Sequence, residues 1–236
     1  MLENKYHILS TRPVEATSIE AAAAAGIQID ILSFIETTAI TTTEVIEEIQ
    51  DVANKKATVI FTSMNAVEAV AHQLPNFSPD WKIFCLGSTT KDLCEQYFGA
   101  TSIRGTAPHA GALAESVINA GIKEPLFFFC GNRRRDELPD KLQTQHLNLK
   151  EIVVYETHAI QPSLQKDYDG ILFFSPSAVE SFFSASKIQE KTVLFAIGNT
   201  TATAIRNYTD HTIIISDHPG KENLVQKMIA YFSAIS

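Results

Sequence analysis

Short polar turns follow most of the apolar segments of this chain, and their residue types suit the binding of anions. The turns are Ser10-Thr11-Arg12, Thr62-Ser63, Gly87-Ser88-Thr89, Arg104-Gly105-Thr106, Cys130-Gly131-Asn132-Arg133, Ser175-Pro176-Ser177 and Gly198-Asn199-Thr200-Thr201. Where such a turn opens a helix, free backbone N–H groups and the helix dipole favour a carboxylate or a phosphate. Ser, Thr and Asn are also ordinary N-caps, so one turn alone indicates little. Seven turns on the same side of two sheets indicate a binding site.

Half of the chain's arginines form the run Arg133, Arg134 and Arg135. The pattern predicts a helix that starts near Arg134, and cations are unfavourable at a helix start. An anionic ligand would offset that cost, because guanidinium groups match carboxylate and phosphate geometry. The alternative is a solvated charge run balanced by Asp136 and Glu137. The sequence does not decide which arginine contacts a ligand.

Tyr155 is the side chain best suited to move a proton. It ends a predicted strand, Leu149 to Tyr155, whose other apolar residues are aliphatic. A tyrosine in that place is either a packing residue or, with an ordinary pKa near 10, a neutral proton donor at physiological pH.

Several common catalytic signatures are missing from the sequence. It contains no GxGxxG, GxxxxGK[ST] or GxSxG motif, which weakens dinucleotide, P-loop and serine hydrolase interpretations. The histidines show no i, i+4 pairing and the three cysteines show no zinc-type spacing. We therefore expect neither a metal site nor a cofactor.

The elements that position these residues alternate between short apolar strands and helices. Such alternation predicts parallel sheets covered by helices on both faces, an α/β fold. The predicted strands are Tyr6–Ser10, Ile27–Ile35, Thr58–Ser63, Lys82–Gly87, Thr101–Ile103, Leu126–Cys130, Leu149–Tyr155, Ile171–Ser175, Val193–Gly198 and Thr212–Ser216.

Internal repeats divide the chain into two similar halves. Phe61 to Glu68 resembles Phe173 to Glu180, and Ile83 to Thr90 resembles Leu194 to Thr201, each about 112 residues later. Two similar α/β halves have two rims of strand-end loops, and the space between them suits one ligand. A cut near Gly121 would give contiguous domains.

A third repeat suggests a different division of the chain. Glu36 to Ile40 resembles Glu156 to Ile160, offset by about 120 residues. The extended segments Phe34–Ile40 and Tyr155–Gln161, which contain these copies, could cross between domains as a paired ribbon. Periodicity alone does not choose between the two divisions.

Composition places limits on the partners of the protein. A chain of 236 residues with 45% hydrophobic and 19% charged residues is typical of a globular protein. Its net charge of −8 argues against a general nucleic-acid binder, although a local basic site stays compatible with it. We expect a cytoplasmic protein with reduced thiols, since no signal peptide and no membrane span is recognisable.

Taken together, these turns resemble the uroporphyrinogen-III synthase family. The matching motifs are Phe61-Thr62-Ser63 with Asn65-Ala66-Val67, Phe129-Cys130-Gly131-Asn132 with Arg135, Val154-Tyr155-Glu156-Thr157, Phe173-Phe174-Ser175-Pro176-Ser177 and Ala196-Ile197-Gly198-Asn199-Thr200-Thr201-Ala202. Each motif is weak alone, but the ordered set spans nearly the whole chain.

The resemblance implies two similar α/β domains joined by a two-stranded ribbon, with residues 1–34 and 161–236 in one domain and 35–160 in the other. It implies cyclisation of the linear tetrapyrrole hydroxymethylbilane to uroporphyrinogen III, with loss of water and inversion of ring D, without cofactor or metal. Tyr155 then protonates or positions the departing hydroxyl group. The implied substrate contacts are Arg12, Thr62, Ser63, Ser88, Thr106, Gly131, Asn132, Arg133, Ser175, Ser177, Thr200 and Thr201.

Two alternatives stay open at this stage. A two-lobed binding protein for a small anionic ligand would share the architecture, but the short length and missing signal peptide argue against it. A diverged nucleotide-sugar transferase lacks a recognisable phosphate loop. We expect a monomer with no nucleic-acid or membrane partner, whose degree of domain closure the sequence does not predict.

Overall fold

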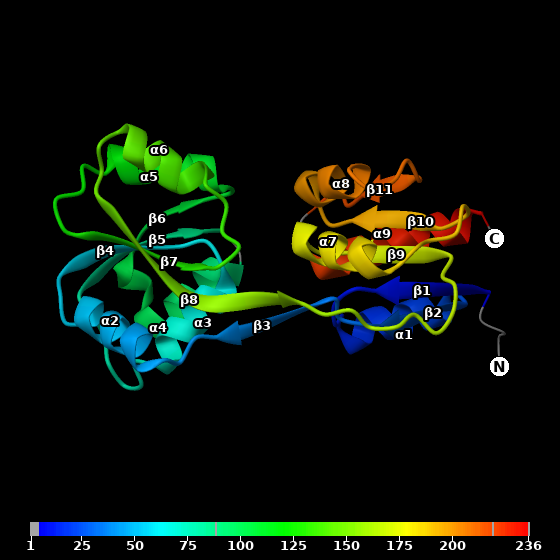
Figure 1. The fold of residues 1–236 in the computed structure, drawn as a ribbon, viewed down its shortest axis with the longest axis horizontal. Coiled ribbons are helices and arrows are strands. Elements are labelled where there is room, and N and C mark those ends of the chain that lie inside the picture. The colour runs from blue at the N-terminus through cyan, green and yellow to red at the C-terminus, as the bar shows by residue number, and fades with distance from the viewer. Residues whose placement is uncertain (1–4, 88, 219, 236) are drawn as a thin grey trace. The chain divides into compact units, whose positions relative to one another are not determined.

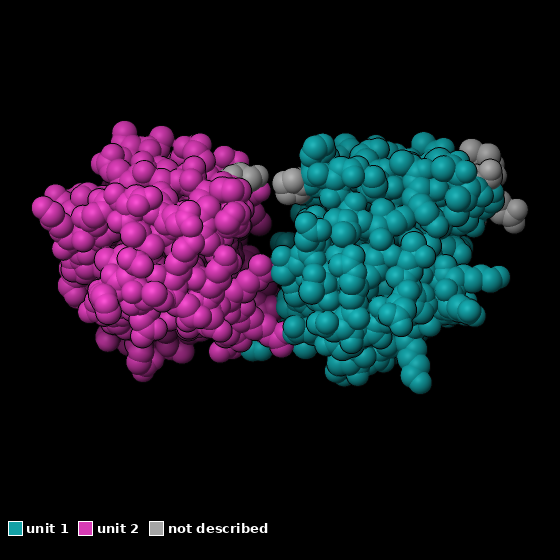
Figure 2. Space-filling model, turned by 90° about the horizontal axis from the view of Figure 1, so that it is seen from above, with its two compact units in different colours: residues 1–36, 158–236 teal, residues 37–157 magenta. Residues whose placement is uncertain are grey.

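The computed structural model describes residues 5–87, 89–218 and 220–235, and the chain divides into two compact units. Unit 1 joins the chain up to Glu36 with the chain from His158 onward, and unit 2 is the continuous segment Thr37–Thr157 (Figure 2). Each unit is built on its own sheet with helices on both faces (Figure 1). The predicted α/β class is confirmed.

Unit 1 contains a parallel sheet of five strands in the order β11-β10-β9-β1-β2. The strands are β1 (Tyr6–Ser10), β2 (Ile27–Ile31), β9 (Gly170–Phe173), β10 (Val193–Ala196) and β11 (Ile213–Ile215). One face packs on α1 (Ala16–Ala24) and α9 (Lys221–Ala234), and the other packs on α7 (Pro176–Ala185) and α8 (Asn199–Arg206).

Unit 2 contains a sheet of six strands in the order β3-β8-β7-β4-β5-β6. The strands are β3 (Ile35–Ala39), β4 (Ala57–Phe61), β5 (Trp81–Leu86), β6 (Ile103–Ala107), β7 (Leu126–Gly131) and β8 (Leu149–Ala159). One face packs on α2 (Thr43–Ala53), α3 (Met64–His72) and α4 (Thr89–Phe98), and the other packs on α5 (Ala110–Asn119) and α6 (Glu137–Thr144). A 3-10 turn at Ala100–Ser102 precedes β6.

The paired strands β3 and β8 carry the chain between the units. Ile40 N–H donates to Val154 C=O and Ile160 N–H donates to Phe34 C=O, both at 2.9 Å, so the two strands run antiparallel. The boundary between the units falls inside both strands, at Glu36 and at His158. The predicted two-stranded ribbon is therefore present.

The two sheets share one spatial arrangement with a permuted connectivity. The strand order β8-β7-β4-β5-β6 in unit 2 corresponds to β2-β1-β9-β10-β11 in unit 1. These five strands of unit 2 come from one continuous segment of the chain. In unit 1, β1 and β2 come from the N-terminal segment, and β9, β10 and β11 come from the segment after β8. The sequence repeat of about 112 residues equates β4 with β9 and β5 with β10. Strands β1 and β2 then occupy the places of β7 and β8.

Two predicted strands differ from the structure. The segment expected as a loop, Arg104-Gly105-Thr106, lies inside β6, because Gly105 is a packing residue: an added Cβ would lie 2.7 Å from Phe84 Cδ1. The predicted strand Ile27–Ile35 is interrupted after β2, where fully buried Phe34 packs on Phe182.

The observed boundaries of one more strand and one helix differ from the predicted ones. Tyr155 does not end its strand, since pairing with β3 extends β8 to Ala159. The helix expected to start near Arg134 is α6, which begins at Glu137.

Candidate active site

Four of the polar turns follow the strands between which the strand order of each sheet reverses. In unit 2 the reversal lies between β4 and β7, and in unit 1 it lies between β1 and β9. Ligands of open α/β sheets bind outside the carboxyl ends of the strands at such switch points. The turn at Thr62-Ser63 follows β4, and Asn132 follows the last residue of β7, Gly131; in unit 1, Arg12 follows β1 and Ser175 follows β9.

Tyr155 lies beside the switch point of unit 2. It is half-buried in β8, which pairs with β7, and its ring lies over buried Gly131. Ser63 hydrogen-bonds to the phenol, and the Ser63 oxygen also accepts the Asn65 N–H at 3.2 Å as the N-cap of α3. Burial raises the pKa of Tyr155 above its ordinary value, although the Ser63 hydrogen bond acts in the opposite direction. The phenol is therefore a neutral O–H group at physiological pH.

The arginine run lies in the loop between β7 and α6 rather than in a helix. The first turn of α6 instead carries Glu137 and Asp140, as the helix dipole favours. The arginines therefore do not lie at the helix start, contrary to the prediction, because α6 begins at Glu137 with Asp136 in the N-cap position.

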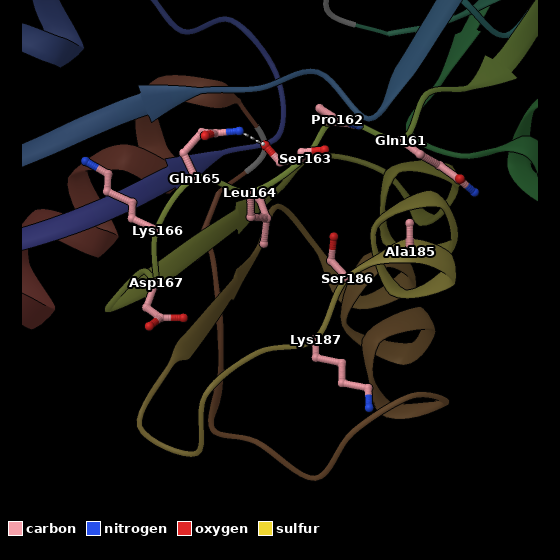
Figure 3. Close-up of a pocket in the computed structure, with 10 residues that line it drawn as sticks. All are labelled: Gln161, Pro162, Ser163, Leu164, Gln165, Lys166, Asp167, Ala185, Ser186 and Lys187. Atoms are coloured by element: carbon pink, nitrogen blue, oxygen red, sulfur yellow. Dashed lines mark hydrogen bonds between the residues drawn. The ribbon is translucent and has the colours of Figure 1, made fainter.

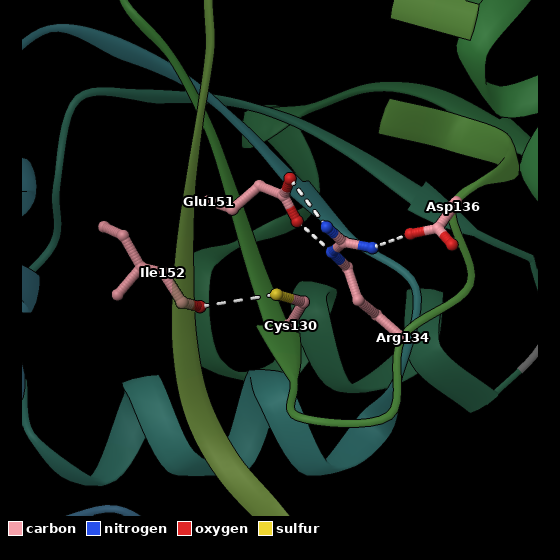
Figure 4. A network of polar contacts seen from close by, with 5 residues as sticks. All are labelled: Cys130, Arg134, Asp136, Glu151 and Ile152. Atoms are coloured by element: carbon pink, nitrogen blue, oxygen red, sulfur yellow. Dashed lines mark hydrogen bonds and ion pairs between the residues drawn. The ribbon is translucent and has the colours of Figure 1, made fainter. Parts of the chain in front are cut away.

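One arginine of this run is held by carboxylates of its own unit. Arg134 pairs with Glu151 through Nε and through Nη2, the latter at 2.9 Å, and its Nη1 pairs with Asp136 (Figure 4). Cys130 lies nearby, with its Sγ 3.7 Å from the Ile152 carbonyl oxygen. Arg133 and Arg135 are exposed, whereas Arg134 is partly buried.

The switch point of unit 1 is lined by hydroxyl groups. Ser175 caps α7 by accepting the Ala178 N–H at 3.3 Å, and its oxygen lies 3.1 Å from that of Ser177. Across the switch point Thr11 is buried and donates to the Leu172 C=O at 2.7 Å, which fixes the chain just before exposed Arg12. The two serines and Arg12 thus surround the carboxyl ends of β1 and β9.

The neighbouring helix α8 begins without a side-chain cap. Its N-cap residue is Gly198, and none of the described side chains accepts a hydrogen bond from its first N–H groups. Thr200 is exposed, whereas the Thr201 side chain is buried within the unit. A helix start of this kind can bind a carboxylate through its main chain, so side-chain substitution would have little effect there.

The remaining predicted residues are less closely grouped. Thr62 is half-buried next to Ser63, and exposed Thr106 lies near the end of edge strand β6. Ser88 lies outside the described residues. The sequence analysis missed His109, whose Nδ1 accepts the Ala112 N–H at 3.2 Å as the N-cap of α5. It also missed Glu151. Histidine is not a typical capping residue, and an ion pair over 17 residues leaves no periodic signal.

One hollow of unit 1 does not coincide with these turns. It measures about 530 Å³ and is lined by residues 161–167 and 185–187 of unit 1 (Figure 3). These segments lead into β9 and out of α7, so they lie at the amino ends of the strands. Because ligands of such sheets bind at the carboxyl ends, we do not assign the active site to this hollow.

The described residues provide neither a metal-binding cluster nor a membrane-spanning helix. No group of three or more His, Cys, Asp or Glu side chains in the described ranges could hold a metal ion. Among the helices of the described chain, none is both long enough and apolar enough to cross a membrane.

Comparison with known proteins gives one family and several similar structures. The family described as Uroporphyrinogen-III synthase HemD matches residues 17–226. The crystal structure of uroporphyrinogen-III synthetase from Helicobacter pylori is similar, with a TM-score of 0.69 and 18% identity over 96% of this chain and 99% of that one. A mutant uroporphyrinogen III synthase from Thermus thermophilus gives 0.67 and 11% identity over 98% of both chains. The wild-type Thermus thermophilus enzyme gives 0.54 and 11% identity over 98% and 100% of the two chains.

Proposed function

Because the chain belongs to the uroporphyrinogen-III synthase family, we propose that it converts hydroxymethylbilane into uroporphyrinogen III with loss of water and inversion of ring D. The reaction is a cyclising dehydration in tetrapyrrole biosynthesis. The observation that supports it best is the Tyr155 phenol, a neutral proton donor at the switch point of unit 2. Tyr155 is the proposed catalytic residue.

The proposed chemistry needs only a weak acid. Electron release from a pyrrole nitrogen breaks the bond between the hydroxymethyl carbon and its oxygen, and the Tyr155 proton converts the departing hydroxyl group into water. The substituted carbon of ring D attacks the carbon that is left, and the resulting spiro intermediate rearranges to the inverted ring. The proton released when the pyrroles regain aromaticity restores the phenol. Geometry supplies most of the acceleration, because a bent substrate places the reacting carbons together.

The proposed substrate contacts are the residues of the two rims. Hydroxymethylbilane carries many carboxylates, which suit N–H groups, hydroxyl groups and arginines. In unit 2 these are Thr62, Ser63, Ser88, Thr106, Gly131, Asn132 and Arg133; in unit 1 they are Arg12, Ser175, Ser177, Thr200 and Thr201. The uncapped start of α8 and the exposed Arg12 and Arg133 support carboxylate binding.

The setting of the enzyme is also part of the proposal. We propose a cytoplasmic monomer that uses no metal or organic cofactor and has no nucleic-acid or membrane partner. We further propose domains of residues 1–34 with 161–236 and of residues 35–160, a division supported by the two compact units. Gel filtration with light scattering tests the monomer, and activity that survives exhaustive chelation tests the independence from metal.

The decisive experiment separates product isomers. Hydroxymethylbilane is generated in place, the protein is added, the products are oxidised and the uroporphyrin isomers are separated. The unassisted reaction gives isomer I, so a protein-dependent shift to isomer III is expected, with heat-denatured protein as the control. Isomer I alone from a folded sample would contradict the proposed function and favour a binding protein for an anionic ligand.

A further inference from the structure

An irregularity in the unit 2 sheet brings Tyr155 next to Gly131. Along β7 and β8, Cys130 pairs with Val153, but Gly131 pairs with Tyr155, so Val154 is an extra residue on β8. Such a bulge locally changes the direction of the side chains on the bulged strand. Here it places the Tyr155 ring over the last residue of β7.

The Tyr155 ring occupies the space that a side chain at position 131 would need. A Cβ on Gly131 would lie 2.4 Å from Tyr155 Cζ, 2.5 Å from Cε2 and 2.8 Å from the phenol oxygen. All three distances are shorter than real Cβ contacts. Gly131 is not among the glycines with positive φ, so the requirement is steric rather than conformational. Any larger residue must displace the phenol or move the strand.

Asn132 holds β8 at Tyr155 and two residues beyond it, at Thr157. Its backbone N–H donates to the Tyr155 C=O at 3.1 Å, and its side-chain Oδ1 accepts the Thr157 N–H at 2.9 Å. The side chain thereby continues the pattern of strand hydrogen bonds beyond the end of β7. These two bonds fix the backbone position of Tyr155 relative to Gly131.

Ser63 is a polar neighbour of the Tyr155 phenol, and its influence lowers the pKa of that group. The Ser63 oxygen accepts the Asn65 N–H at 3.2 Å as the N-cap of α3, which fixes the Ser63 side chain. A neutral phenol beside a fixed hydroxyl group suits a proton donor.

We propose that Gly131 and Asn132 are positioning residues that hold the Tyr155 phenol in its catalytic place, Gly131 by leaving room for the ring and Asn132 by pinning the strand. This inference rests on the proposed function. It assigns Gly131 a role that no substrate contact would explain, and it gives Asn132 a role in the catalytic step besides any contact with substrate.

The first test is a double-mutant cycle on turnover with Gly131→Ala and Tyr155→Phe. If Gly131 acts through the phenol, each single variant lowers kcat about tenfold or more, and the double variant falls no more than about twofold below Tyr155→Phe. Independent effects that multiply in the double variant would overturn the inference, as would a Gly131→Ala variant with wild-type kcat.

A stability cycle tests the same contact without relying on activity. Gly131→Ala should lower the thermal midpoint of the wild-type protein but not that of a Tyr155→Ala protein, which lacks the ring. Gly87→Ala is the matched control, because its added Cβ would meet only the Ala107 carbonyl oxygen at 3.7 Å. An equal loss in both backgrounds would contradict the contact. Since this cycle needs no substrate, it distinguishes failure of the inference from failure of the proposed function.

Asn132 is tested by comparing two substitutions. Asn132→Ala removes the acceptor for the Thr157 N–H and should lower kcat about tenfold, in addition to any rise in KM from a lost substrate contact. Asn132→Asp keeps an oxygen acceptor and should retain most of the wild-type kcat. A rise in KM with unchanged kcat in Asn132→Ala would show that the residue only binds substrate, and loss of kcat in both variants would exclude the pinning role.

Discussion

Tyr155 combines partial burial with the polar neighbour Ser63, and both influence its proton chemistry. We predict that Tyr155→Phe lowers turnover at least about tenfold, equivalent to roughly 1.4 kcal/mol of activation free energy. The ring and its packing on Gly131 are retained, so stability should change little. The measurement is the initial rate of isomer III formation, with Tyr97→Phe as the control because Tyr97 is 38% exposed on α4. An unchanged rate in Tyr155→Phe would remove its catalytic role.

The raised pKa of Tyr155 gives a second prediction at this scale. Burial is the larger influence and raises the pKa, whereas the Ser63 hydrogen bond lowers it. The phenol should therefore ionise above the ordinary tyrosine pKa near 10. The neutral phenol should add to the free energy of unfolding below about pH 10, and this contribution should be lost as pH rises through the raised pKa. The pKa of Tyr155 is measured by titrating tyrosinate absorbance in the wild type and subtracting the titration of Tyr155→Phe. In Ser63→Ala the transition should move to still higher pH; a shift to lower pH would contradict the contact.

Individual site residues could be predicted only where local chemistry marks them. Ser63 and Gly131 lie at polar strand ends and Tyr155 lies inside β8, and the structure brings the three together beside one switch point. The pairing of Arg134 with Glu151 could not be predicted, because strand pairing rather than periodicity brings these side chains together.

At the scale of elements, the segment that leads from β8 into β9 is tied to β2 by one carboxylate. Asp30 of β2 accepts hydrogen bonds from Lys166 at 2.8 Å, from Tyr168 at 3.1 Å and from Gln28 at 3.0 Å. Burial alone would raise the pKa of Asp30, but these hydrogen bonds outweigh it and the pKa is lowered. The same burial and the Asp30 carboxylate raise the pKa of Tyr168 to about 12.

This network predicts acid sensitivity of unit 1. A carboxylate with a lowered pKa stabilises the fold above the unfolded value near 3.9, and the stabilisation is lost as pH falls through the folded value. The wild-type thermal midpoint should therefore drop below about pH 4, and Asp30→Asn should show a flatter dependence in that window. Asp51→Asn, which removes an exposed helical ion pair with Lys55, is the control and should follow the wild-type profile. Parallel profiles for Asp30→Asn and wild type would rule out the contribution.

Element types were easier to predict than element boundaries. Strand β1 begins and ends at the predicted residues, because its apolar segment ends at a polar turn. Strand β6 was misplaced because Gly105 was taken as a turn residue, whereas it makes room for the Phe84 ring. Such close packing depends on a distant segment and leaves no local pattern.

At the scale of the whole molecule, the permuted connectivity makes the two units unequal in sequence. Unit 2 is one continuous segment with two hydrophobic clusters of its own, whereas unit 1 needs both ends of the chain. The repeats predicted two similar halves, but only strand pairing shows that β1 and β2 take the places of β7 and β8. Because unit 2 lies between the two segments of unit 1, the spacing of the sequence repeats does not reveal which strands of the two units correspond.

This asymmetry predicts different folding behaviour for the isolated units. A fragment of residues 37–157 should fold alone, because its core and all strands except the outer ends of β3 and β8 are formed within the continuous segment. The measurement is a cooperative thermal transition by circular dichroism together with dispersed amide resonances. The fragment should lack synthase activity, since the donors of the unit 1 rim are missing.

Unit 1 should fold only when its two segments are joined. Because β3 and β8 run antiparallel across the unit boundary, an Asn-Gly turn that links Glu36 to His158 would close unit 1 into one chain. The joined chain should show its own cooperative transition, whereas residues 158–236 alone should not, because they lack the two strands β1 and β2 that complete the sheet. A cooperative transition in residues 158–236 alone would show that unit 1 does not need β1 and β2 to fold. The absence of a cooperative transition in the joined chain would show that unit 1 depends on unit 2 for its stability.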